Sequence, residues 1–359
     1  MNEHEKYFHY IEDQCLRCHS CRCYHSTSLI GEVCYGELAT LLLNHELKEF
    51  PDSIFGCHQC GLCLKKCPKN FNAKEFMFHA RAWIEAEDKS FCNYYNGVRV
   101  DKKENQFSKQ KRENSIHYVD TLLEEGDCKR LFVPGCHMTS GFPELTKKVT
   151  SFLQEKNIAD GMTAVCCGNP LYAAGLYEEF KNYIEKMDEL YKKHHTKEIL
   201  TPCPSCYDFN KRVQNMGYLQ GIEVKCLSKE LAEHKIKINR KAFPEEYKIS
   251  FHDSCPDRKN GVFAESIRRL YQDFETEEME HIKENTLCCG CGGLVPPYSQ
   301  TISTEGKKLK KQDFEKTGSD CLITTCFNCY KGLKSVVPVH QYLEDLIMGN
   351  EEELAEESL

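Results

Sequence analysis

The sequence lacks any apolar run near the roughly 20 residues that a membrane-spanning helix requires. Residues 38–43, which include four leucines, are among its longest apolar stretches and are far too short. Residues 1–6 do not combine basic and apolar residues in the way that a secretion signal does. We therefore expect a protein of the reducing cytoplasm that reaches the inner face of a membrane only through a partner.

An excess of basic residues is missing as well. The formal net charge is −8, and residues 350–359 contain five glutamates. A surface that binds nucleic acid needs a concentrated basic face. We therefore expect no nucleic-acid partner, and we expect residues 350–359 to form a solvated acidic tail.

The third absence is a dinucleotide-binding fingerprint. The stretch 290–293 reads Gly-Cys-Gly-Gly and does not have the G-x-G-x-x-G spacing that cradles a pyrophosphate. We expect no flavin in this chain, so any flavin or nicotinamide chemistry belongs to a partner protein.

Cysteine, in contrast, is abundant, at 24 of 359 residues. In a short secreted chain this density would indicate disulfides. Here the chain is long, and most of its cysteines stand in C-x-x-C or adjacent C-C spacings. These spacings favour metal binding over structural disulfides.

Two cysteine runs near the N-terminus predict iron–sulfur clusters. The second run has the complete bacterial ferredoxin pattern, C-x-x-C-x-x-C-x-x-x-C-P, at Cys57, Cys60, Cys63 and Cys67. The first run begins with the same spacing, at Cys15, Cys18 and Cys21, but has His25 where the fourth cysteine should fall. A zinc ribbon needs only C-x-x-C pairs. Three evenly spaced cysteines, given twice, favour iron–sulfur clusters over zinc.

The ferredoxin pattern also predicts which cysteines share a cluster. In two-cluster ferredoxins, the fourth cysteine of each run ligates the other cluster. One 4Fe–4S cubane is therefore assigned to Cys15, Cys18, Cys21 and Cys67. The other cubane is assigned to Cys57, Cys60, Cys63 and Cys23. Cys34 and His25 are alternatives to Cys23 as the last ligand.

The remainder of the chain contains an internal duplication of five cysteines. The first copy consists of Cys136, Cys166, Cys167, Cys203 and Cys206. The second copy consists of Cys255, Cys288, Cys289, Cys326 and Cys329. Counterparts are offset by 119 to 123 residues, which is nearly constant. A repeat of this length indicates two equivalent structural units, and we infer two equivalent cofactor sites that face each other.

The hydrophobic pattern predicts α/β layers with mainly parallel sheets, because short apolar strands alternate with longer helices. The expected strands are 130–136, 198–203, 247–251 and 321–326. The expected helices are 37–43, 73–88, 144–156, 171–194 and 262–274. Several of the repeated cysteines stand at the carboxyl end of a strand, where ligand sites of parallel sheets gather.

The pattern also suggests how the chain divides. A small helical, ferredoxin-like domain with two cubanes is expected over residues 1–95, and a polar linker is expected over 96–128. The first repeat is expected over 129–240 and the second over 241–349.

The paired frames, each with the form C…CCG…C-x-x-C, resemble the CCG domains in the catalytic subunit of heterodisulfide reductase. With a ferredoxin-like segment in front, the layout is similar to the fused form of that enzyme, which works with a membrane cytochrome b. The resemblance implies that each set of five cysteines binds a noncubane 4Fe–4S cluster. It also implies that a small-molecule disulfide is held between the two clusters and receives one electron from each side. The electrons would reach these clusters through the cubanes.

The resemblance leaves two functions open. The first is disulfide reduction in a complex with a flavoprotein, a hydrogenase or formate dehydrogenase module, or a membrane cytochrome b. The alternative is a non-catalytic electron-transfer subunit of a flavin-dependent glycolate, lactate or glycerol-3-phosphate dehydrogenase that passes electrons to quinone. The complete second copy favours the first function.

Basic residues near the repeated cysteines could bind the anionic groups of a coenzyme disulfide. The candidates are Lys211, Arg212, Arg258, Lys259, Lys331 and Lys334. The simpler expectation for most of them is a solvated helix face.

Overall fold

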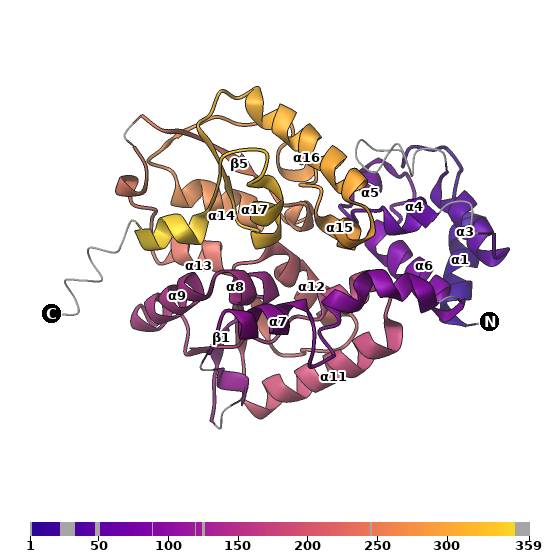
Figure 1. Ribbon diagram of the computed structural model, residues 1–359, viewed down its shortest axis with the longest axis horizontal. Coiled ribbons are helices and arrows are strands. Elements are labelled where there is room, and N and C mark those ends of the chain that lie inside the picture. Colours follow the sequence, from indigo (N-terminus) through magenta and orange to yellow (C-terminus); the bar gives the residue numbers. More distant parts are fainter. Residues whose placement is uncertain are drawn as a thin grey trace. The chain divides into compact units, whose positions relative to one another are not determined.

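The computed structural model describes residues 2–21, 33–46, 51–87, 89–118, 120–123, 126–244 and 246–348 (Figure 1). The acidic tail expected over 350–359 lies outside these residues. The chain forms two compact units, each assembled from separate segments. The first unit comprises Met1–Lys102, Pro170–Phe180 and Leu287–Lys310. The second comprises Lys103–Asn169, Lys181–Thr286 and Lys311–Leu359.

The second unit contains two four-stranded sheets of identical topology. The first sheet has the order β2-β1-β3-β4, and the second has the order β6-β5-β7-β8. The strands of the first sheet are β1 (Arg130–Phe132), β2 (Gly161–Met162), β3 (Glu198–Thr201) and β4 (Glu223–Cys226). The strands of the second sheet are β5 (Lys248–His252), β6 (Glu275–Thr276), β7 (Cys321–Thr324) and β8 (Val339–Gln341). Every strand pair is parallel, which confirms the predicted α/β class.

Helices alternate with these strands. In chain order they are α7 (Gln106–Glu113), α8 (Cys136–Gly141), α9 (Pro143–Glu155), α10 (Asn169–Ala174), α11 (Tyr177–Lys193), α12 (Pro204–Asn215) and α13 (Leu227–Glu233). The later ones are α14 (Val262–Leu270), α15 (Val295–Tyr298), α16 (Gln300–Glu315) and α17 (Phe327–Leu333). The segment expected as a linker thus contains α7, whose first turn is capped by Asn105.

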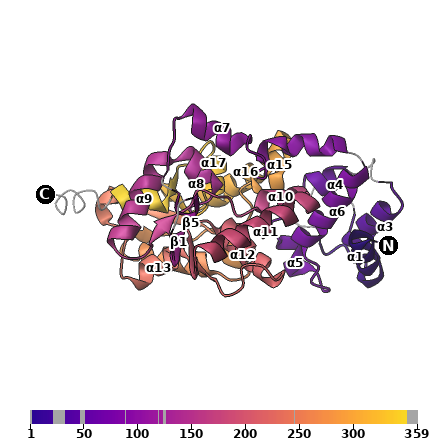
Figure 2. The same ribbon diagram turned by 90° about the horizontal axis from the view of Figure 1, so that it is seen from below.

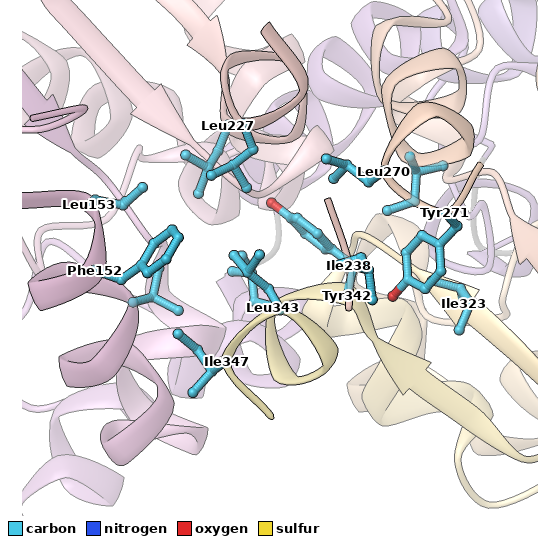
Figure 3. Close-up of a cluster of buried hydrophobic side chains, with 14 of the residues drawn as sticks. Phe152, Leu153, Leu227, Ile238, Leu270, Tyr271, Ile323, Tyr342, Leu343 and Ile347 are labelled. Atoms are coloured by element: carbon cyan, nitrogen blue, oxygen red, sulfur yellow. The ribbon is translucent and has the colours of Figure 1, made fainter. Parts of the chain in front are cut away.

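The two sheets share one hydrophobic core. Leu153 of α9 and Leu227 of α13 belong to the first repeat, and Leu270 and Ile323 belong to the second, yet all four are buried in one cluster (Figure 3). Burial of apolar side chains contributes about 1.5–3 kcal/mol per large residue. A shared core therefore holds the two repeats together as one body.

The N-terminal part of the first unit is helical. Its helices are α1 (Glu3–Gln14), α3 (Tyr35–Leu43), α4 (Pro51–Phe55), α5 (Leu62–Lys66) and α6 (Ala73–Glu87), followed by the 3₁₀ segment η2 (Lys89–Val98) (Figure 2). Among its described residues this part contains no strand. Asn2 caps α1 through a capping box with Glu5. The observed helices agree with the helical character expected for residues 1–95, while the ferredoxin-like assignment stays a prediction.

Two predicted helices are wrong in extent. The helix expected over 171–194 is interrupted at Gly175, which has a φ of +78°. A Cβ atom there would lie 2.5 Å from the backbone nitrogen of Ala82, so α6 passes too close for any side chain. The helix expected over 262–274 ends at Leu270, where the chain turns toward β6. No helix among the described residues is both long and apolar enough to cross a membrane.

Candidate metal centres

The five cysteines of the first repeat converge in the second unit. Cys136 begins α8, the adjacent pair Cys166 and Cys167 precedes α10, and the remaining two stand at the start of α12. Their thiols form a continuous series of side-chain hydrogen bonds that runs from Cys136 to Cys166, Cys167, Cys206 and Cys203. None of the five forms a disulfide. The structure therefore brings together all five thiols that the sequence grouped.

Hydrogen bonds between these thiols lower the pKa of some of the five cysteines and raise the pKa of others. Hydrogen bonds from Cys136 and Cys167 hold the pKa of Cys166 well below its usual value. Hydrogen bonds from Cys206 and Cys326 do the same for the pKa of Cys203. The pKa values of the donors Cys136 and Cys206 are raised, because these thiols lose the interaction when they ionise. Soft anionic sulfur donors gathered in a buried site are the ligands that iron–sulfur clusters use, so the residues fit such a group.

The backbone before Cys136 is adapted to this crowding. Gly135 has a φ of +85°, and a Cβ atom built on it would lie 3.2 Å from the Cys206 sulfur. A side chain at this position would therefore be strained and would press on a thiol of the site. The glycine allows the end of β1 to deliver Cys136 next to α12.

The two repeats meet at equivalent cysteines. The thiol of Cys203 forms a hydrogen bond with that of Cys326, its counterpart in the second repeat. Both residues precede a helix and have almost the same backbone angles, φ −99° and ψ 116° for Cys203 and φ −98° and ψ 117° for Cys326. The duplication read from the sequence is thus a duplication of local geometry.

The second set of five is divided between the two units. Cys255, Cys326 and Cys329 belong to the second unit, and the Cys329 sulfur lies 3.8 Å from the Ser254 hydroxyl. Cys288 and Cys289 belong to the first unit, where both are buried. The assignment of all five to one cluster therefore stays a prediction.

The first N-terminal set also gathers. Cys15, Cys18, Cys21 and Cys67 line one hollow. Burial raises the pKa of Cys21 to about 11, so metal binding would have to replace its proton. The ferredoxin pattern, in which the fourth cysteine of one run ligates the other cluster, grouped these four cysteines. The fold brings all four to one hollow.

Cys34 lines the same hollow. Its sulfur lies 3.9 Å from that of Cys15. The structure therefore places this alternative ligand beside the first set. The other two candidates for the last ligand of the second set, Cys23 and His25, lie outside the described residues.

The second N-terminal set is more deeply buried. Cys57, Cys60 and Cys63 are each at most 7% exposed. The backbone N–H of Gln59 donates to the Cys57 sulfur at 3.4 Å. The hydroxyl of Tyr35 lies 2.9 Å from the Cys63 sulfur. Such N–H and O–H groups around sulfur are the contacts by which proteins adjust the reduction potential of a cluster.

Two lysines flank the first-repeat site. Burial lowers the pKa of Lys331 and of Lys111. The negative charge of Cys136 opposes the shift for Lys331, and those of Asp120 and then Cys136 oppose it for Lys111. The Lys111 ammonium donates to the carbonyl of Ala164 at 3.4 Å. The Lys331 ammonium lies 2.9 Å from where a Cβ of Gly141 would stand. Neither lysine forms an ion pair with a carboxylate among the described residues.

Other candidate cations have different roles. Arg258 donates to the backbone carbonyls of Glu284 and Thr286. Lys211 and Lys334 lie over the rings of nearby tyrosines. Lys331, in contrast, interacts electrostatically with Cys136 of the first-repeat site.

Sequence reasoning missed Lys111, Tyr35 and Arg81. Each is far in sequence from the sulfur it approaches, and none belongs to a cysteine motif. For Arg81, the sequence offered one indication: it lies among the apolar residues of the helix α6 that are buried.

Comparison with known proteins defines the class. A model of the cysteine-rich CCG domain matches the chain twice, over residues 131–209 and 249–334. These two ranges contain every repeated cysteine, and each contains the central strands of one sheet.

Several individual proteins are similar to this chain. The chain is 25% identical to a dihydromethanophenazine:CoB–CoM heterodisulfide reductase subunit of Methanosarcina mazei, over 84% of this chain and 78% of that protein. It is 22% identical to an iron–sulfur protein of Methanococcus maripaludis, over 80% of this chain and 58% of that protein. It is 26% identical to lactate utilization protein A of Lysinibacillus sphaericus, over 46% of this chain and 75% of that protein. The chain thus carries the CCG cysteine-rich domain twice and is similar, over most of its length, to heterodisulfide reductase subunits.

Proposed function

We propose that this chain is the catalytic iron–sulfur subunit of a heterodisulfide-reductase-like complex. It would reduce a small anionic disulfide at two facing five-cysteine sites. The observation that carries the proposal is the contact between Cys203 and Cys326, because it joins the two repeats at their thiols. A substrate with two bonded sulfur atoms matches a site that is itself doubled.

The reaction consumes two electrons and two protons, and it converts one disulfide into two thiols. Four clusters, when bound, would supply electrons one at a time. Noncubane clusters would be held by the two repeated sets, which are Cys136, Cys166, Cys167, Cys203 and Cys206, and Cys255, Cys288, Cys289, Cys326 and Cys329. Cubanes would be held by the N-terminal sets, with Cys23 as the proposed last ligand.

The protein's own side chains would bind and orient the disulfide. Lys331 and Lys111 provide two positive charges next to Cys136, and neither forms an ion pair with a carboxylate in the described part of the chain. Carboxylate, sulfonate or phosphate groups form strong charge-assisted hydrogen bonds with such ammonium groups. This arrangement supports an anionic substrate and favours binding from the side of α8.

The chain would work with partner subunits. Electrons would enter this chain through its N-terminal clusters. Their source, a flavin or another two-electron donor, would belong to a partner. The heterodisulfide reductase relatives are themselves named as subunits, which supports a complex. A flavoprotein, a hydrogenase or formate dehydrogenase module, and a membrane cytochrome b are the proposed classes of partner.

A second function is supported by the relatives named lactate utilization protein A. In this alternative the chain passes electrons from a flavin-dependent dehydrogenase toward quinone and reduces no disulfide. The N-terminal clusters would have the same role in both functions, and only the repeated sites would differ in use.

Reduction of disulfides by the anaerobically purified chain separates the two functions. Reduced benzyl viologen would serve as the donor, with 3,3′-dithiodipropionate, 2-hydroxyethyl disulfide and cystamine as anionic, neutral and cationic acceptors. We expect the anionic disulfide to be reduced fastest. Cys289→Ser should abolish this activity and leave the N-terminal cubane signals intact, whereas Cys128→Ser, at a buried cysteine outside every set, should keep both.

A different result of the same assay would support the electron-transfer function. A chain that carries its full iron content and yet reduces none of the three disulfides would favour the electron-transfer function. Recovery of a flavoprotein dehydrogenase with the chain from native extracts would then support that alternative directly.

A further inference from the structure

Arg81 carries a buried positive charge in the middle of α6. Only 1% of the residue is exposed. Its guanidinium donates hydrogen bonds to backbone carbonyls. The acceptors are Ile54 at 3.0 and 3.3 Å, Phe55 at 3.3 Å, Cys57 at 3.3 Å, Ala173 at 2.6 Å and Gly293 at 2.7 Å.

No carboxylate pairs with this charge among the described residues. A buried ion without a counter-ion is strongly disfavoured, and carbonyl dipoles compensate for it only in part. The guanidinium lies beside Cys57, whose carbonyl accepts one of its hydrogen bonds at 3.3 Å. The arrangement suits a site that acquires negative charge next to Cys57.

The carbonyls that Arg81 binds come from three separate parts of the chain. Cys57 belongs to the N-terminal ferredoxin pattern, and Ala173 follows the Cys-Cys pair of the first repeat. Gly293 follows the Cys-Cys pair of the second repeat. One side chain thus connects the cubane-binding run to the segments behind both pairs.

The turn at residues 290–293 is pressed against the cubane-binding run. A Cβ on Gly293 would lie 2.1 Å from the Cys57 carbonyl oxygen, and one on Gly292 would lie 2.4 Å from that of His58. Both positions must be glycine for the backbones to approach so closely. The imidazole of His58 also interacts with the backbone of Gly290.

We propose that Arg81 is a positioning residue that raises the reduction potential of the cluster bound by Cys57, Cys60 and Cys63 and holds the 290–293 turn against it. The inference rests on the cluster assignment of the proposed function. A cluster gains one negative charge when it is reduced. A fixed positive charge nearby in a poorly screened interior stabilises that reduced state. The same side chain would keep the second repeat's cysteine pair close to the electron donor.

Potentiometric titration followed by electron paramagnetic resonance tests the charge. Arg81→Met and Arg81→Gln remove the charge, and Gln keeps up to two of the hydrogen bonds, so it is the variant more certain to fold. Arg81→Lys keeps the charge but cannot reach all five carbonyl groups. Lys6→Met removes one positive charge from an exposed position in the same unit and is the matched control.

We expect both neutral variants to lower the midpoint potential of one of the two cubane signals and to leave the other unchanged. Arg81→Lys should keep the wild-type potential, and Lys6→Met should have no effect on it. Hydrogen exchange of the backbone amides in 287–294 should be faster in all three Arg81 variants, because the carbonyl clamp on Gly293 is weakened.

The results can fail in two distinguishable ways. If the wild-type chain shows no second cubane signal, the cluster assignment in the proposed function is wrong. If the wild-type signals are present but the neutral variants shift the potential no more than Lys6→Met does, the role of Arg81 is disproved and the cluster assignment stands.

Discussion

The hydroxyl of Tyr35 and the sulfur of Cys63 form a hydrogen bond of 2.9 Å, and both residues are buried. Burial, with the negative charge of Cys63 and its neighbours, raises the pKa of Tyr35 well above its usual value. The hydroxyl therefore stays protonated and donates to the sulfur. A donor at a cluster ligand stabilises the more negative, reduced state.

Tyr35→Phe should consequently lower the potential of the cluster bound by the second N-terminal run. It should also reduce the free energy of unfolding by about 1 kcal/mol, the usual net value of one buried hydrogen bond. Tyr10→Phe, at a residue that is 56% exposed, is the control. Potentiometric titration measures the first effect. Equal potentials in the two variants would exclude the hydrogen bond as a tuning contact.

Cys206→Ser should remove one noncubane cluster and leave the cubanes in place. The thiol of Cys206 links those of Cys167 and Cys203, so its loss breaks the series of five donors in two. Iron content of the anaerobic protein should fall from about 16 to about 12 atoms per chain, since each cluster contains four. Two outcomes would contradict the assignment of Cys206 to a noncubane cluster. One is an unchanged iron content, and the other is a loss of the N-terminal cubane signals together with the iron.

Lys331→Met and Lys111→Met should each raise the KM for 3,3′-dithiodipropionate about tenfold, since an interaction of about 1.4 kcal/mol corresponds to that factor. The value of kcat should change much less, because the lysines are proposed to bind the substrate's charged groups. Cystamine should bind the variants no worse than the wild type. Lys334→Met, on an exposed residue next to α17, is the control. A fall in kcat with an unchanged KM would contradict a role in binding.

Acid should destabilise the first unit through His79. The ring nitrogens Nδ1 of His4 and His79 lie 2.8 Å apart, and burial, with the charge of His4, lowers the pKa of His79 to about 4. The folded state therefore binds a proton less readily than the unfolded state, whose histidine has a pKa near 6.5. The stabilisation is complete above pH 6.5 and is lost as the pH falls toward 4.

Urea unfolding at pH 7.5 and pH 5 measures this effect. We expect His79 to account for about 1–2 kcal/mol of the stability lost between these values. His79→Gln should remove that part of the loss, while His9→Gln, at an exposed histidine, should not. If the two variants lose stability equally, another group causes the pH dependence.

Much of the fold was readable from the sequence because its signals are local. Strand β3 was predicted over residues 198–203 and is observed over Glu198–Thr201, because its short apolar run ends before Pro202. The helix interrupted at Gly175 was predicted as continuous, because its apolar spacing runs through the break. Only the approach of α6 to within 2.5 Å of that position requires a glycine turn there.

The candidate site divides in the same way. Cysteine spacing grouped Cys15, Cys18 and Cys21 with Cys67, and the fold brings all four to one hollow. Spacing could not reveal that Cys34 stands beside this same group. It also could not reveal Lys111, which is 25 residues from the Cys136 that it approaches.

By itself, the sequence determined that this protein has two repeats with five thiols each, behind two runs that can hold cubane clusters. It could do so because ligand spacing and strand ends are properties of short segments. Only the tertiary structure decided that Cys203 touches Cys326 and that Arg81 joins the cubane-binding run to the segments behind both cysteine pairs. Those relationships depend on how distant segments pack in a common core, and no local pattern encodes that packing.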